Sequence, residues 1–254
     1  MDPSAPAVEL RDVRLAYRGR EALRGVDLVI GRGERVAVLG PNGAGKSSLL
    51  RCLTGIAEGC RGSVRLGGVP VEQLGRGGVA RRVAVVPQLA ALPFAMGVRE
   101  VVALGRIPHE DPLRGLRPAD RAAVEAAIGR VGIGALAERD ARELSLGERQ
   151  LVLVAMAVAQ QAPLLVLDEP TVHLDLRHRV GVMELLAELN QGDGVTVVAV
   201  LHDLALARAF FPRLVLLADG RVVADGPPDE VLAAERVEAV FGVDRALAAL
   251  VGAA

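Results

Sequence analysis

One glycine-rich segment carries residue types suited to phosphate chemistry. Residues 40–47 end in Lys46 and Ser47 and directly follow the apolar run 35–39. Glycines let successive backbone N–H groups curl toward phosphate oxygens, and a helix that begins at the lysine adds its partial positive charge. This strand, loop and helix pattern is that of a P-loop, so the segment predicts binding of a nucleoside triphosphate such as ATP.

The loop residues have separate predicted tasks. Lys46 is the only lysine among 30 basic residues, which indicates a site that needs a compact ammonium instead of a planar guanidinium. We expect Lys46 to reach the β- and γ-phosphates and Ser47 to coordinate Mg²⁺, which prefers oxygen ligands. The residues predicted to bind the triphosphate here are Gly40, Pro41, Asn42, Gly43, Ala44, Gly45, Lys46, Ser47 and Ser48.

A pair of acidic residues provides the second half of the predicted site. Asp168 and Glu169 follow the apolar run 164–167, which is the form of a Walker B segment. We expect Asp168 to hold Mg²⁺ through its water shell and Glu169 to polarise the attacking water. The two roles require two carboxylates, and together with the P-loop they predict hydrolysis of the nucleotide.

The elements that must position these residues alternate between strands and helices. Short, continuously apolar runs predict strands that are buried on both faces, and helical patterns separate several of them. The predicted strands are 35–39, 83–86, 164–167, 195–201 and 214–217, and the predicted helices between them are 46–54, 177–190 and 204–211. The early runs 8–15 and 63–66 predict antiparallel strands.

The pattern changes between Gln88 and Gln161, where 98–104, 119–131 and 145–160 predict helices with no strong strand between them. The predicted fold class is therefore α/β: a P-loop NTPase core with a mostly parallel sheet and an antiparallel β part, plus an inserted helical subdomain. The predicted division is 1–87 for the first part of the core, 88–161 for the helical subdomain and 162–254 for the second part with the C-terminal tail.

Composition excludes several other classes of protein. The chain has 254 residues and is 51% hydrophobic, which suits a large core, yet its longest apolar run, 151–159, is far shorter than the roughly 20 residues of a membrane span. Residues 1–10 show no secretory signal, and Cys52 and Cys60 do not indicate a disulfide framework. A net charge of -1 argues against a nucleic-acid partner.

Further motifs follow the order of a known family. The segment LSLGERQ at 144–150, the segment TVHLD at 171–175 and His202 resemble those of ABC ATPase cassettes, and the resemblance covers nearly the whole chain. It implies that Gln88 senses Mg²⁺ and the attacking water, that Asp175 contacts an opposite subunit, and that His202 hydrogen-bonds the γ-phosphate.

The LSLGERQ segment also has a physical logic of its own. Ser145 and Glu148 have capping-box spacing, so a helix starting there would present N–H groups and a dipole to an anion. In the family that anion is the γ-phosphate held by the other subunit, so the resemblance implies a homodimer with Ser145, Gly147 and Glu148 at the shared site. Leu146 departs from the glycine usual in the family, which puts the turnover rate in question.

Tyr17 is the predicted adenine contact. It lies 23 residues before Gly40, about where the family places an aromatic residue that stacks on the base. Stacking suits any flat base, so it predicts modest selectivity for ATP. Packing of this single tyrosine is the alternative.

Several segments narrow the resemblance to importer cassettes of the iron-siderophore, haem and cobalamin group. These segments are 63–66, 92–106, 174–178 and 219–228. The resemblance implies a peripheral protein on the cytoplasmic side of the membrane whose ATP hydrolysis drives a polytopic permease. A substrate-binding protein would be an indirect partner. Among the substrates of the group, a ferric siderophore is the first choice. The loop after Gln88, with Leu92, Pro93 and Phe94, would dock the permease.

Other functions remain open on the sequence alone. They are a soluble ABC ATPase without a permease, an ABC cassette for another substrate, a P-loop kinase and a nucleotide-sensing module that does not hydrolyse. Soluble ABC ATPases usually carry tandem cassettes or long insertions, for which 254 residues leave no room. A kinase would have no reason to carry the LSLGERQ segment beside Glu169 and His202.

Overall fold

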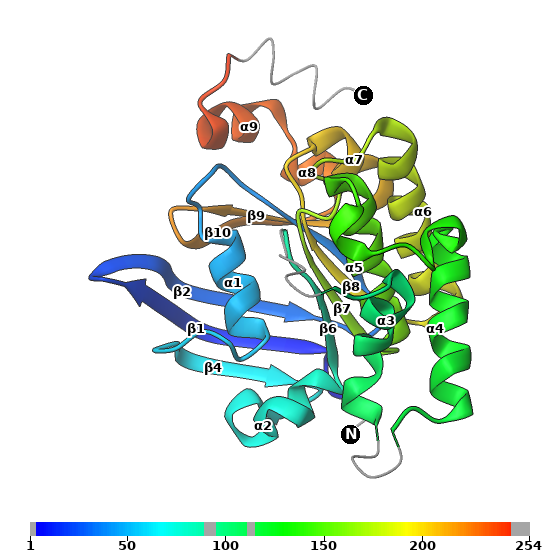
Figure 1. Cartoon of the computed structure of the whole chain (residues 1–254). Helices are drawn as coiled ribbons and strands as arrows, with labels where there is room; N and C mark the ends of the chain where they lie inside the picture. Colours follow the sequence, from blue (N-terminus) through cyan, green and yellow to red (C-terminus); the bar gives the residue numbers. More distant parts are fainter. Residues whose placement is uncertain (1–3, 89–94, 111–114, 245–254) are drawn as a thin grey trace. The chain divides into compact units, whose positions relative to one another are not determined.

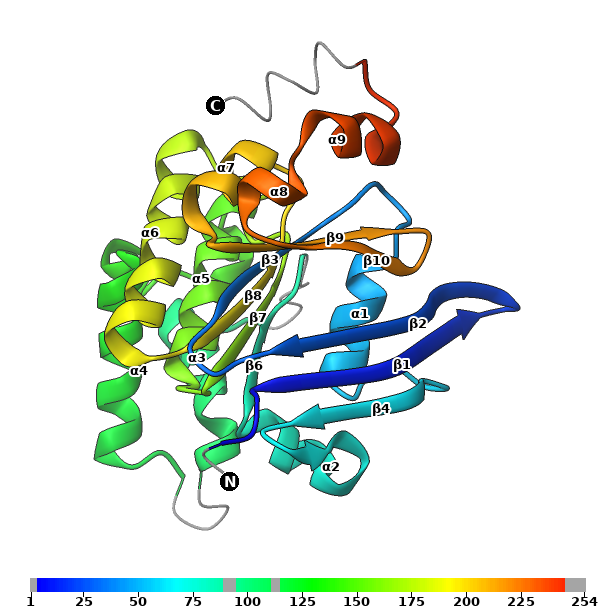
Figure 2. The same ribbon diagram turned by 180° about the vertical axis from the view of Figure 1, so that it is seen from behind.

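The fold is described from a computed structural model, which covers residues 4–88, 95–110 and 115–244. The chain divides into two compact units, and Figures 1 and 2 label their helices and strands. Unit 1 combines Met1–Val79 with Thr196–Ala254, and unit 2 is Ala80–Val195. The three-part division predicted from the sequence stays a prediction.

Unit 1 contains an antiparallel sheet in the order β2-β1-β4-β5. Its strands are β1 Val8–Tyr17, β2 Arg20–Ile30, β4 Arg61–Leu66 and β5 Val69–Pro70. Arg18 and Gly19 both have positive φ, which matches the tight hairpin turn between β1 and β2. The predicted antiparallel strands are confirmed. The sequence analysis missed β2, because a bulge at Gly25 interrupts the alternation that would otherwise mark its buried side chains.

The second strand group of unit 1 builds the base of the P-loop. β3 Arg35–Leu39 lies between β8 Thr196–Val200 and β9 Arg213–Ala218 and is parallel to both. Val36 to Leu39 are fully buried, as the continuous apolar run predicts. β9 pairs with β10 Arg221–Gly226 as an antiparallel hairpin.

The helices of unit 1 begin with α1, which follows β3 and contacts β2 and β4 (Figure 1). Among the described residues of this unit the helices are α1 Lys46–Leu53, α2 Val71–Ala80, α7 Leu204–Phe210, α8 Pro228–Val231 and α9 Ala234–Phe241. α2 crosses into unit 2 at its last residue, and its helical path is interrupted at Gly75, whose φ is 59°. The predicted helices 46–54 and 204–211 match α1 and α7 to within one residue.

Unit 2 joins a parallel strand pair to a group of packed helices. The pair is β6 Val83–Val86 and β7 Leu164–Asp168, aligned from Val83 with Leu164 to Val86 with Leu167. α3, α4 and α5 pack against one another, and α4 also contacts α6. The helices are α3 Val98–Ala103, α4 Pro118–Val131, α5 Leu146–Ala159 and α6 Leu176–Asp193, with short 3₁₀ turns at Leu104–His109, Gly134–Leu136 and Ala141–Glu143.

A buried ion pair ties these helices together. The Arg106 guanidinium donates to Asp120 at 3.1 and 3.0 Å, to the Ala159 carbonyl at 2.8 Å and to the Gln161 side chain at 2.9 Å. Asp120 also accepts the backbone N–H of Arg117 at the start of α4. That N–H, followed by the Arg106 guanidinium, lowers the pKa of Asp120. Arg106 therefore links the 3₁₀ turn after α3 to the first turn of α4 and to the last residue of α5.

The predicted fold class is confirmed: parallel strands carry the P-loop and the acidic pair, an antiparallel β part accompanies them, and the helices α3, α4 and α5 fall in the predicted segment. Within the residues that the structure describes, no helix has the length and apolar character needed to cross a membrane. The predicted docking residues Leu92, Pro93 and Phe94 lie outside the described residues.

Candidate nucleotide-binding site

The side chain of Lys46 folds back onto the phosphate loop and hydrogen-bonds two of its carbonyl oxygens. Lys46 is the first residue of α1 and is 6% exposed. Its ammonium donates to the carbonyl oxygens of Gly40 at 2.8 Å and Pro41 at 3.0 Å. The ammonium group is thus held at the first two residues of the loop, where it can bind phosphate oxygens. Ser47 and Ser48 follow in the first turn of α1, and the connecting residues Asn42 and Gly43 are exposed.

Two of the loop glycines are required by both φ and space. Gly40 has φ 147° and Gly45 has φ 103°, conformations that other residues rarely adopt. A Cβ at Gly40 would lie 2.0 Å from the Leu217 carbonyl oxygen, and one at Gly45 would lie 2.4 Å from the Ala22 carbonyl oxygen. The loop is therefore packed directly against the backbone of β9 and β2.

The turn between β9 and β10 anchors the loop from the other side. The N–H of Gly220 donates to the Ala44 carbonyl at 3.0 Å, while the Gly220 carbonyl accepts from the N–H of Arg24 at 2.8 Å. Sequence reasoning did not identify this support. The turn itself had a signal, because Asp219 and Gly220 form an Asp-Gly pair between two β-type runs, which is typical of a tight hairpin turn. Its contact with the P-loop had none.

His202 is exposed and lies in the short connection between β8 and α7 of unit 1. The next residue, Asp203, begins α7 by accepting the N–H of Leu206 at 3.0 Å. This N-cap fixes where the helix starts and so where the connection ends. His202 therefore lies two residues after the end of β8, a strand parallel to β3, and its contact with the γ-phosphate stays a prediction from the family resemblance.

Tyr17 closes the β1–β2 hairpin and is 41% exposed, so it is not a plain core residue. It borders a cavity of about 470 Å³ in unit 1. The other residues lining the cavity are Ala16, Arg18, Arg51, Ile56, Ala57 and Glu58. The cavity thus lies between the β1–β2 hairpin, the end of α1 and the segment that follows α1.

In unit 2, Gln88 and Glu169 meet side by side. Each comes just after its strand, β6 or β7, and the carboxyl ends of neighbouring parallel strands lie at the same edge. The amide nitrogen of Gln88 donates to the Glu169 carboxylate at 2.6 Å. Glu169 has φ 51°, which turns the chain sharply after Asp168, the last residue of β7. Asp168 and Glu169 are both partly exposed.

The predicted capping box at the start of α5 is present. The Ser145 hydroxyl accepts the N–H of Glu148 at 3.2 Å, and the Glu148 carboxylate accepts the N–H and hydroxyl of Ser145, each at 2.8 Å. These two donors, the N–H first, lower the pKa of Glu148, so it stays ionised. Leu146, the first residue of the helix, is 52% exposed.

The start of α5 also packs on the segment before α6. A Cβ at Gly147 would lie 3.0 Å from the His173 carbonyl oxygen, so a larger residue would push the two segments apart. Asp175 caps α6 by accepting the N–H of His178 at 2.9 Å, and this bond lowers the pKa of Asp175. The sequence analysis missed the cap, although an Asp directly before a helical pattern is a known signal for one.

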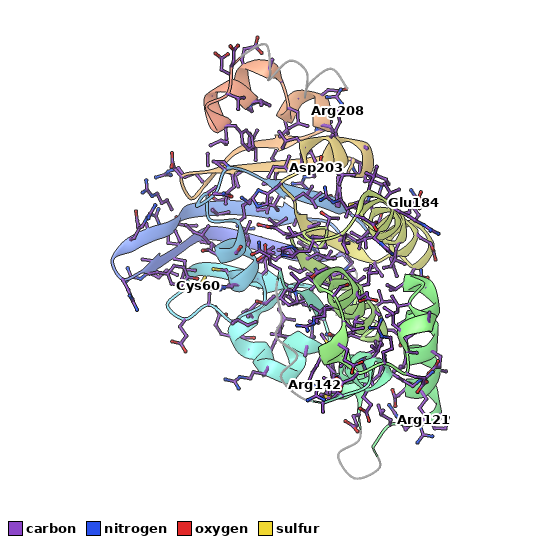
Figure 3. The ribbon with its side chains drawn as sticks, turned by 45° about the horizontal axis from the view of Figure 1, so that its top comes forward. Cys60, Arg121, Arg142, Glu184, Asp203 and Arg208 are labelled. Atoms are coloured by element: carbon purple, nitrogen blue, oxygen red, sulfur yellow. The ribbon has the colours of Figure 1, made fainter. Side chains whose placement is uncertain are left out.

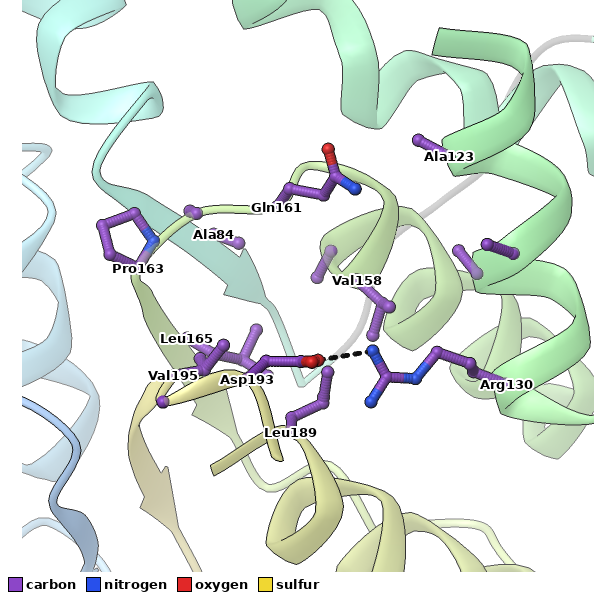
Figure 4. A pocket seen from close by; sticks show the side chains of 15 residues that line it. Ala84, Ala123, Arg130, Val158, Gln161, Pro163, Leu165, Leu189, Asp193 and Val195 are labelled. Carbon is purple, nitrogen blue, oxygen red and sulfur yellow. Dashed lines mark hydrogen bonds and ion pairs between the residues drawn. The ribbon is translucent and has the colours of Figure 1, made fainter. Parts of the chain in front are cut away.

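A separate cavity of about 480 Å³ lies in unit 2 between α4, the end of α5 and the end of α6 (Figure 4). Its wall is mostly alanine and other apolar side chains, and Arg130 and Asp193 form an ion pair at 2.6 Å on it. None of the predicted site residues lines this cavity.

The loop, its buried lysine and the parallel strands that carry it define a P-loop nucleotide-binding protein. The family model for ABC transporters matches residues 23–172, from β2 through the acidic pair. The chain therefore belongs to the ABC transporter family, and the family resemblance predicted from the sequence is confirmed.

Curated relatives fall in the predicted group. The hemin import ATP-binding protein HmuV of Streptomyces coelicolor is 44% identical over 94% of this chain and 85% of its own length. The ferric enterobactin transport ATP-binding protein FepC of Escherichia coli is 37% identical over 96% and 90%. The cobalamin import ATP-binding protein BtuD of Halobacterium salinarum is 44% identical over 91% of this chain, which spans 57% of the length of that relative.

A solved structure shares the fold. A dimeric ATP-binding cassette in a post-hydrolysis state, bound to ADP and Pi, superposes with a TM-score of 0.78 at 28% identity. The match covers 87% of this chain and 98% of that one. That structure is dimeric, which is the assembly that the sequence analysis predicts for this chain.

Proposed function

We propose that this protein is the ATP-hydrolysing subunit of an ABC importer and takes up an iron-siderophore, haem or cobalamin compound through a partner permease. The observation that carries the proposal is the contact between Gln88 and Glu169 at the edge of a parallel strand pair. A carboxylate held there by an amide has the form of a base that activates water. The named importer relatives support the transport role.

The P-loop would bind ATP through the backbone N–H groups of residues 40–48 and the ammonium of Lys46. The donor set for Mg²⁺ comprises the Ser47 hydroxyl, the Asp168 carboxylate and the Gln88 amide. Because the side-chain nitrogen of Gln88 donates to Glu169, the side-chain oxygen of Gln88 is the atom that could bind Mg²⁺. These oxygen donors suit Mg²⁺, which would neutralise charge on the β- and γ-phosphate oxygens.

Hydrolysis would use Glu169 as the base and His202 as a hydrogen-bond partner of the γ-phosphate. Gln88 would position the Glu169 carboxylate through the 2.6 Å bond. The site of each subunit would be completed by a second copy. Its Ser145, Gly147 and Glu148 would bring the start of α5 to the phosphates, and its Asp175 would lie at the same interface.

The assembly would lie at the cytoplasmic face of the membrane, with two copies of this chain on a polytopic permease and a substrate-binding protein as an indirect partner. Purification of a tagged copy from membranes, with mass-spectrometric identification of bound proteins, tests this assignment. A stoichiometric polytopic permease, absent from an untagged preparation, is the expected result. Ribosomal or DNA-repair proteins in its place would contradict the transport role and favour a soluble ABC ATPase.

Replacing Tyr17 with alanine should weaken ATP binding by about 10-fold, because the stacking surface for adenine is lost. Tyr17→Phe keeps the ring and should stay within about 2-fold of the parent. Titration of the purified protein with ATP by calorimetry gives both values. Equal affinity in all three proteins would assign Tyr17 to packing alone.

Replacing Leu146 with glycine should raise the ATPase rate by about 5-fold and leave ATP affinity unchanged. The half-exposed leucine side chain stands at the end of α5 that would approach the partner's phosphates, so its removal eases closure. Steady-state ATPase assays and ATP titrations separate the two effects, and Leu146→Ala should give an intermediate rate. Equal rates in the parent and Leu146→Gly would refute this role.

A further inference from the structure

The two cysteines of the chain face each other within unit 1. Cys52 lies in the last turn of α1 and is 2% exposed, whereas Cys60 is partly exposed and directly precedes β4. Their Sγ atoms are 3.2 Å apart, so a shift of about 1 Å brings them to disulfide bonding distance. Figure 3 labels Cys60 among the side chains of this region.

We propose that Cys52 and Cys60 form an oxidisable dithiol that closes to an intrachain disulfide when the protein meets a hydroperoxide. This modification site is independent of the proposed function. It also differs from a structural disulfide framework, because both thiols are free in the reduced protein.

The environments of the two thiols assign them different roles. The hydrogen-bond contact between the two thiols lowers the pKa of Cys60, while the same contact and then burial raise the pKa of Cys52. The thiolate is the reactive form of cysteine, so the accessible Cys60 is the residue that attacks the oxidant. Cys52, in contact with it, is placed to resolve the product, as in redox-sensing pairs.

The chemistry requires only a hydroperoxide. The Cys60 thiolate attacks the hydroxyl oxygen of the peroxide and the O–O bond breaks, which gives Cys60 sulfenic acid. The other oxygen leaves as hydroxide from hydrogen peroxide or as alkoxide from an organic hydroperoxide. The Cys52 sulfur then attacks the Cys60 sulfur. The S–S bond forms, the S–O bond breaks, and the thiol proton leaves with the hydroxyl as water. The two thiols lose two electrons in total, and the peroxide is reduced by two.

The bridge would tether the segment between α1 and β4. Gly55 and Gly59 both have positive φ in this segment, which indicates a chain path set by turns instead of by a helix or strand. Ile56, Ala57 and Glu58 from the same segment line the cavity beside Tyr17. Oxidation would therefore fix one wall of that cavity to α1.

The sequence allows a direct test. Trypsin cleaves after Arg51 and Arg61, so both cysteines fall in one peptide, residues 52–61. The reduced full-length protein is treated with hydrogen peroxide, alkylated and digested, and the mass of that peptide is measured. We expect a peptide about 2 Da lighter than the unalkylated thiol form, carrying no alkyl group, and recovery of two alkylatable thiols after dithiothreitol.

Two single variants serve as controls. Cys60→Ser keeps the buried thiol, and Cys52→Ala keeps the accessible one without leaving an unpaired hydroxyl in the core. Neither should give the lighter peptide, and Cys52→Ala should accumulate oxidised Cys60. The proposal fails if peroxide leaves both parental thiols alkylatable. It also fails if Cys60 reaches the sulfinic acid while Cys52 stays free, or if the product is a disulfide-linked dimer on a non-reducing gel.

Discussion

Glu169→Gln should lower kcat for ATP hydrolysis by about 100- to 10,000-fold and leave ATP affinity within about 2-fold of the parent. The substituted amide oxygen can still accept the Gln88 donor, which lies 2.6 Å from the carboxylate in the parent, so the local geometry is kept and only the proposed base is lost. Single-turnover hydrolysis and ATP titration on the purified protein measure the two effects. Hydrolysis as fast as in the parent would show that Glu169 is not the base.

The same variant tests the predicted dimer. With hydrolysis blocked, two copies should stay closed around ATP, so light scattering with saturating MgATP should report a dimer and without nucleotide a monomer. Glu184→Gln is the matched control, because Glu184 is an exposed acid on α6. It should hydrolyse like the parent and show no trapped dimer. A Glu169→Gln protein that stays monomeric would contradict the shared site.

The sequence was most informative where one short segment contains both the chemistry and its support. The P-loop, the acidic pair at 168–169 and the capping box of Ser145 and Glu148 are local patterns of strand, turn and cap, and local patterns fix local conformation. The strands of continuous apolar residues were predicted to within about two residues for the same reason, because burial on both faces leaves a direct trace in composition.

Features that depend on contacts between residues far apart in the chain could not be predicted from the sequence. The bond between Gln88 and Glu169 joins residues 81 positions apart, and the ties of Arg106 to Asp120 and Gln161 span 14 and 55 positions. The support of the P-loop by Gly220 depends on the pairing of β9 with β3, and the facing cysteines depend on the return of the chain from α1 to β4. One sequence gives residue types but not which of these distant residues meet.

Lys46 is the only lysine of the chain, and its contacts in the structure give a physical reason for a lysine at this position. Arginine serves at every other basic position, yet position 46 is buried and its ammonium bonds two carbonyl oxygens of the same loop. A guanidinium is larger, planar and donates in a fixed fork, so it does not fit a point between two carbonyls of so tight a turn. Size and shape therefore explain why this position keeps lysine while the rest of the chain does not.

Lys46→Arg should therefore behave as a loss of function despite the conserved charge. We expect ATP affinity and kcat each to fall by about 100-fold, as when a positioned donor to a developing negative charge is removed. Arg121→Lys, on the exposed side of α4, makes the reverse exchange away from the site and should change neither value. Far-ultraviolet circular dichroism and thermal unfolding establish that the variant is folded before activity is compared. If Lys46→Arg binds and hydrolyses ATP like the parent, charge alone suffices at this position, and the argument from the geometry of the loop is wrong.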